Sequence, residues 1–121
     1  ADADAGAASR VARLESLLSA LAADSMEGRR TGTPGAHRAA RFLAAELERY
    51  GVEAAGDDGY LQPVPMARVT MTTAAGVRER LVIPSEGVDF DTIPEDRILP
   101  GEANVVGILR GSDPEVADEA V

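Results

Sequence analysis

The segment that most constrains the fold is 24–56, which combines a glycine-rich loop, a helix start, an amphipathic helix and a helix stop. Thr33 is a good N-cap, because its side-chain oxygen can accept a hydrogen bond from a first-turn amide, and Pro34 suits the first helical position. Gly51 can take the left-handed conformation that ends a helix, and Val52 can then fold back onto the last turn. The sequence therefore predicts a helix that begins at Pro34 and ends just before Gly51.

The predicted helix is amphipathic, since its apolar residues recur at steps of three and four. The apolar stripe consists of Ala36, Ala39, Ala40, Leu43, Leu47 and Tyr50. A second helix of the same kind is expected from Ser9 to about Asp24, and 1–8 is expected to be a flexible tail. Each stripe needs an apolar partner. The two helices could pack on each other or on a sheet, and the strands predicted further along the chain favour the sheet.

The middle of the chain predicts a β-hairpin. Tyr60 to Thr73 reads as extended, and the missing amide hydrogens of Pro63 and Pro65 fall on one edge, so this is expected to begin as an edge strand. A turn at 74–76 leads into a returning strand. The following segment, 84–101, is predicted to be loop-like. Its small apolar anchors are Val88, Phe90 and Ile93.

Asn104 to Leu109 is a short, nearly continuous apolar run, which favours a strand buried on both faces inside a larger α/β sheet. The turn at 110–114 and the segment 115–121 then lead toward another element. A strand that needs cover on both faces this late in the chain suggests the truncated part of a larger domain.

Composition excludes several classes of function. The 21 acidic and 12 basic side chains give a formal charge of -9, which repels phosphate and argues against nucleic-acid or anionic-membrane binding. With no cysteine there is neither a disulfide framework nor a thiolate metal site. No apolar run is long enough to predict a membrane span.

Two separated stretches resemble one family. The run from Leu21 to Gly35, with Tyr50-Gly51-Val52 and 59–65 after the helix, resembles the opening of the aminopeptidase Y family of zinc-dependent exopeptidases, of the leucyl aminopeptidase and glutamate carboxypeptidase type. The run 104–114, with 118–121, resembles the strand and turn that precede that family's first metal-binding strand. The resemblance covers roughly 15–66 and 103–121. The middle matches less well, so the protease-associated insertion of many relatives looks absent.

The resemblance implies a fold and an activity. The expected fold is α/β, with two amino-terminal helices, a hairpin and a buried strand of an incomplete zinc-exopeptidase mixed sheet, over the domain 9–121. The expected function is that of the amino-terminal part of a secreted or periplasmic aminopeptidase, which removes amino-terminal residues from peptides with water activated by two zinc ions. The family's first ligands, in a His-x-Asp arrangement, would lie just past Val121. No catalytic or metal-binding residue is therefore expected in this chain, and the substrate-binding residues stay unknown.

Residues that could carry other chemistry each have a simpler interpretation. His37, the only histidine, is expected to be a polar helix residue. Gly28, Gly32 and Gly35, beside Arg29 and Arg30, could hold an anion at a helix N-terminus, but their spacing fits neither a P-loop nor a dinucleotide fingerprint, and a tight turn is favoured. Ser25 lacks a nucleophile-elbow context. Asp57 and Asp58 are expected in a solvated turn rather than a calcium site. Glu115, Asp118 and Glu119 are also expected in a solvated turn.

Two hypotheses stay open. The first is the peptidase part just described, whose 121 residues alone would be inactive and would bind no zinc. The second is a finished, non-catalytic acidic module that binds a partner and shares the same opening architecture. The sequence beyond Val121 separates them, because the peptidase requires a His-x-Asp in the next strand.

Overall fold

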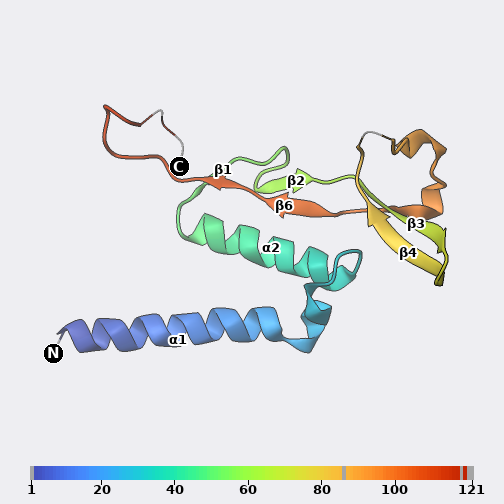
Figure 1. Ribbon diagram of the computed structural model, residues 1–121. Coiled ribbons are helices and arrows are strands. Elements are labelled where there is room, and N and C mark those ends of the chain that lie inside the picture. Colours follow the sequence, from blue (N-terminus) through green and yellow to red (C-terminus); the bar gives the residue numbers. More distant parts are fainter. Residues whose placement is uncertain (1, 86, 118, 120–121) are drawn as a thin grey trace. The chain divides into compact units, whose positions relative to one another are not determined.

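The computed structural model describes residues 2–85, 87–117 and 119 (Figure 1). The chain divides into two compact units, Ala1–Ala39 and Ala40–Val121. The first unit is helical. The second contains the remainder of the helix that crosses the boundary and the strands of the described chain.

The first unit contains helix α1 (Asp2–Ala22) and the 3-10 helix η1 (Asp24–Arg29), followed by the start of α2 (Pro34–Arg49). Helix α1 begins at Asp2 rather than at Ser9, so it extends into the segment predicted as a tail. Alanine has the highest helix propensity, and 5–8 holds three alanines, which explains the longer helix. The expected apolar stripe of α1 is only partly covered. Val11, Leu14 and Leu18 are 55%, 59% and 66% exposed.

Helix α2 has both of the predicted end signals. The amide of Ala36 donates to the Thr33 hydroxyl oxygen at 3.3 Å, which confirms Thr33 as the N-cap. At the other end, Gly51 has φ 72°, and its amide donates to the Glu48 carbonyl. The amide of Val52 donates to the Leu47 carbonyl at 3.0 Å. This pair of bonds is the Schellman motif, so the predicted helix stop is confirmed.

Within the second unit, the carboxyl-terminal half of α2 packs on a strand. A Cβ atom at Gly107 would lie 2.7 Å from Val52 Cγ1 and 3.3 Å from Leu47 Cδ1. The helix therefore approaches the backbone of Gly107 directly, as only glycine permits. The expected sheet partner is confirmed for this half of the stripe, although Leu43 and Tyr50 stay exposed.

The strands form three small antiparallel sheets rather than one mixed sheet (Figure 1). Strand β1 (Glu53–Ala54) pairs with β7 (Gly107–Ile108), and β2 (Leu61–Pro63) pairs with β6 (Ala103–Val105). The third sheet has the order β4-β3-β5, from β3 (Met66–Thr73), β4 (Gly76–Val82) and β5 (Ile98–Leu99). The structure is thus α/β, as expected, but the single mixed sheet is not formed by the described residues.

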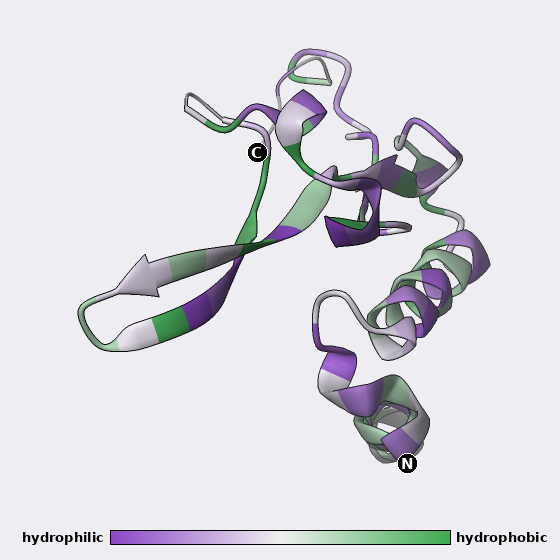
Figure 2. Ribbon diagram, turned by 90° about the vertical axis from the view of Figure 1, so that its right-hand side faces the viewer, coloured by the Kyte–Doolittle hydropathy of each residue, from purple (hydrophilic) through white to green (hydrophobic). Residues whose placement is uncertain are grey.

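The predicted hairpin is confirmed, with Thr73 opposite Gly76 across a two-residue turn. Polar and apolar residues alternate along β3 from Arg68 to Thr72, whereas β4 carries three charged residues in succession, Arg78, Glu79 and Arg80. The hairpin in Figure 2 accordingly shows both hydrophobic and hydrophilic colours, as expected for strands exposed on at least one face. The edge-strand prediction near Pro63 is also confirmed. Strand β2 pairs only with β6 among the described strands, and the next amide, that of Val64, donates to the Glu102 carbonyl on the same side.

The segment predicted as loop-like, 84–101, contains two short 3-10 helices, η2 (Phe90–Thr92) and η3 (Glu95–Arg97), before β5. The Asp89 carboxylate caps η2 by accepting from the Asp91 amide at 3.0 Å. Such local turns carry no apolar periodicity, so the pattern did not reveal them. The three expected anchors, Val88, Phe90 and Ile93, are half-buried.

The strand predicted over Asn104 to Leu109 is corrected in two respects. It is divided into β6 and β7, which pair with different partners, because the chain makes an excursion at 56–60 between β1 and β2. It is also not buried on both faces. Ile108 is 44% exposed and Leu109 is 83% exposed. Among the described residues, only Ala39 and Ala67 are buried apolar side chains.

Neither α1 nor α2 combines the length and the apolar character that a membrane crossing needs.

Candidate functional site

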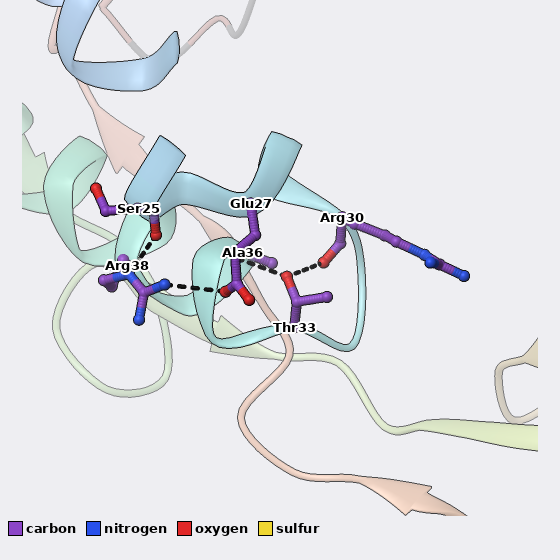
Figure 3. A network of polar contacts seen from close by, with 6 residues as sticks. All are labelled: Ser25, Glu27, Arg30, Thr33, Ala36 and Arg38. Atoms are coloured by element: carbon purple, nitrogen blue, oxygen red, sulfur yellow. Dashed lines mark hydrogen bonds and ion pairs between the residues drawn. The ribbon is translucent and has the colours of Figure 1, made fainter. Parts of the chain in front are cut away.

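The glycine-rich loop before α2 is held in place by Arg38 (Figure 3). The Arg38 Nε atom donates to the Ser25 carbonyl at 2.7 Å, and Nη2 lies 2.9 Å from Glu27 Oε2. Arg29 Nη1 donates to the Leu21 carbonyl. Glu27, Gly28 and Arg29 have φ of 48°, 63° and 57°, so three successive residues are left-handed. Local contacts therefore offset the backbone strain at the two non-glycine residues.

The backbone of Gly35 lies very close to the backbone of Met26. A Cβ atom on Gly35 would lie 2.1 Å from the Met26 carbonyl oxygen and 2.8 Å from Glu27 Cβ. The space beside the first turn of α2 is thus filled by backbone, with a carbonyl oxygen and a carboxylate nearby. An anion would be repelled by both groups, so the geometry favours the tight-turn interpretation of these glycines over an anion cradle.

The other residues singled out from the sequence are dispersed. His37 lies in the first turn of α2, half-buried, and its amide donates to the Thr33 carbonyl at 3.4 Å. Ser25 contributes its carbonyl to the Arg38 contact. Asp57 and Asp58 lie in an exposed turn, as predicted.

Near the carboxyl end, Glu115 lies in a turn, and Glu119 has no regular secondary structure. The amide of Glu115 donates to Asp113 Oδ1 at 3.0 Å, and the amide of Glu119 donates to the Val116 carbonyl. Asp118 is outside the described residues. In the part of the chain that the structure describes, no three His, Asp or Glu side chains gather into a group that could hold a metal ion. The residues present there do not fit the two zinc ions that the family resemblance implies.

The second unit contains an antiparallel ribbon in which the segment 103–109 pairs with β1 and β2. One edge of this segment is bonded throughout. The amide of Val106 donates to the Tyr60 carbonyl at 2.8 Å, and its carbonyl accepts from the Ala55 amide at 3.2 Å, which bridges the gap between β6 and β7. The opposite edge has no strand partner among the described residues. An apolar strand with an unpaired edge is a template for pairing with another strand.

An ion pair fixes the end of this ribbon. Arg110 Nε donates to Glu53 Oε2 at 2.9 Å, and Nη2 donates to Oε1 at 3.0 Å, so the contact is bidentate. The hydrogen bonds and the charge of Arg110 lower the pKa of Glu53, and the same contact raises the pKa of Arg110. Both side chains are more than half exposed, so water screens much of the attraction.

The described part of the second unit also contains hollows that the sequence pattern did not indicate, and two of them are large enough to hold a small molecule. One, of about 350 Å³, is lined mainly by apolar groups such as Leu61, Pro63 and Leu99, with the buried Glu102 beside them. The other, of about 300 Å³, lies beside β3 and the η2–η3 segment. Their lining residues are far apart in sequence, so no local motif could have identified them.

No family model matches the chain, and no curated protein and no solved structure matches it.

Proposed function

We propose that this chain is the amino-terminal part of a zinc-dependent aminopeptidase of the aminopeptidase Y type. The starting point is the sequence resemblance, in which two separated stretches occur in the family's order. The observation that carries the proposal furthest is the exposure of the apolar end of the segment 103–109, at Ile108 and Leu109. Leu109 is 83% exposed and Ile108 is 44% exposed, on a strand with one unpaired edge in the described chain.

The physical argument concerns what would cover this strand. Burying a Leu or Ile side chain stabilises a fold by roughly 1.5 to 3 kcal/mol, so an exposed pair leaves a substantial contribution unused. A further strand added at the unpaired edge of β6 and β7 would satisfy the free backbone groups, and elements packed on the faces of the enlarged sheet would cover these side chains. In the proposed peptidase, the added strand belongs to the central sheet of the catalytic part. The segment 103–109 would then be the first strand of that central sheet.

The described residues do not supply the chemistry of the proposed reaction. Their acidic side chains and His37 form no metal-binding group, so zinc ligands would have to come from other parts of the protein. The contribution of this chain in the proposal is structural. Helix α2 and the ribbon would support one side of the catalytic sheet, and the substrate would be a peptide with a free amino terminus.

The test compares two proteins made from the same coding region. One is the product of the whole reading frame, and the other is the 121-residue chain. We expect the frame to continue beyond Val121 into a strand that contains His-x-Asp. The longer product should hydrolyse an amino-acid p-nitroanilide with loss of activity on chelation, while the 121-residue chain should be inactive.

The matched control is the longer product with the His of that motif replaced by Ala, which should fold but not hydrolyse the substrate. A stop codon directly after Val121, or a longer product without activity, would refute the proposal. In that case a non-catalytic acidic module that binds a partner would be the better account.

A further inference from the structure

The hollow beside β3 has a charge opposite to that of the chain. Two arginines line it, Arg68 from β3 and Arg97 from η3, and none of the described residues that line it is acidic. The chain as a whole carries 21 acidic and 12 basic residues. The other residues that line the hollow include Thr70 and Thr92, and Ile93 and Pro94 form an apolar wall. The hollow lies entirely within the second unit.

Some of the polar side chains that line this hollow have hydrogen-bond or ion-pair partners, and others have none among the described residues. Arg97 Nη1 lies 3.3 Å from Glu79 Oε1, and the Thr92 hydroxyl donates to the Asp89 carbonyl at 2.7 Å. Arg68 is half-buried, and it has neither a hydrogen bond nor an ion pair within the described part of the chain. The Thr70 hydroxyl, on the same face of β3, likewise has no partner there. Solvent reaches the guanidinium nitrogens of Arg68, so their N–H groups are available to an acceptor that enters the hollow.

We infer that this hollow binds a small carboxylate, with Arg68 as its principal ligand. A guanidinium presents a planar fork of donors that matches the two oxygens of a carboxylate. Thr70 would donate one further hydrogen bond, and Arg97 would add charge while keeping its contact with Glu79. The apolar wall at Ile93 and Pro94 would contact a short aliphatic group next to the carboxylate. This site is independent of the peptidase proposal, because none of its residues is involved there.

The probes are N-acetyl-alanine and N-acetyl-alaninamide, which differ only in the carboxylate. Each is titrated into the ¹⁵N-labelled protein, and binding is followed by amide and arginine Nε shifts. We expect saturable shifts at Val69, Thr70 and Ile93 with the acid, and none with the amide. Arg68→Gln should weaken binding of the acid by roughly tenfold or more, as expected for the loss of a charge-assisted contact.

Arg78→Gln is the matched control, since Arg78 lies on the opposite face of the same hairpin. It should leave the affinity within about twofold. Arg68→Lys keeps the charge but lacks the fork, so it should bind with intermediate affinity and serves if Arg68→Gln fails to fold. Equal shifts with acid and amide, no saturable shift with the acid, or equal weakening by the two Gln variants would each overturn the inference.

Discussion

Replacing Gly35 by alanine tests how the glycine-rich loop is built. Real Cβ atoms essentially never approach another atom within 3.0 Å, and here the Met26 carbonyl oxygen would be at 2.1 Å and its carbon at 2.4 Å. The neighbour is backbone, so it cannot rotate away. The Met26 segment must therefore retreat by about 0.9 Å, in a region where neighbouring atoms are in van der Waals contact.

That movement would disturb the contacts that hold the loop. Arg38 bonds the Ser25 carbonyl and the Glu27 carboxylate on either side of Met26, and the Met26 amide donates to the Ala23 carbonyl at 2.9 Å. Overpacking costs about 1 to 3 kcal/mol, and an overlap with backbone atoms belongs to the upper part of that range, about 2 to 3 kcal/mol. Alanine would return up to about 1 kcal/mol of helix propensity. We expect a net loss of about 1 to 2 kcal/mol from these two effects.

The assay is native-state hydrogen exchange on the amides of η1 and the first turn of α2. Gly35→Ala should speed exchange there roughly five- to thirtyfold, in line with the expected loss of stability. Gly28→Ala is the matched control, since it has no atom within 4 Å of the added Cβ but has φ 63°, and should cost only about 1 kcal/mol. Unchanged or slower exchange in Gly35→Ala would refute the close packing of Met26 on this helix.

Three further predictions follow from the contacts described above. Thr33→Ala removes the N-cap of α2 and should lower helix stability by about 1 kcal/mol, measured by exchange of the Ala36 amide; Thr33→Ser should retain it. Gly6→Ala adds a methyl group in open space within α1 and favours the helix by about 0.5 to 1 kcal/mol. Circular dichroism should therefore show a higher helical content, whereas a lower helical content would contradict the start of α1 at Asp2. The pKa of the Glu53 carboxyl, measured by carbon-detected NMR, should lie below its ordinary value of 4.5 and should return toward that value in Arg110→Gln. Because the pKa is lowered in the folded protein, the contact stabilises the fold at pH values above the ordinary pKa. This stabilisation is lost as the pH falls through the folded pKa.

Much of the local structure was predictable because its signals are local. The cap at Thr33, the stop at Gly51 and the hairpin turn before Gly76 each depend on a few adjacent residues with strong conformational preferences. The predicted start of α1 at Ser9 is wrong, because the alanines before this serine favour a helix and Ser9 lies inside it.

The arrangement of the strands was less predictable. The apolar run at 104–109 indicates a strand correctly, but not that Val106 lies between two short pairings or that Leu109 is exposed. Both depend on the excursion at 56–60, where the Gly56 amide donates to the Gly59 carbonyl at 2.8 Å. Arg68 and Arg97 line the same hollow because β3 pairs with β5, directly after Arg97, and no sequence motif indicates this. Long-range pairing of this kind leaves little trace in sequence spacing.

We propose that this chain supports a zinc-dependent catalytic part without itself holding the metal. Zinc content by mass spectrometry, measured on the whole reading-frame product and on the 121-residue chain after the same zinc loading and desalting, tests it directly. The account predicts about two zinc ions per molecule of the longer product and no stoichiometric zinc in the 121-residue chain. Two zinc ions held by the 121-residue chain, or none held by the longer product, would contradict it.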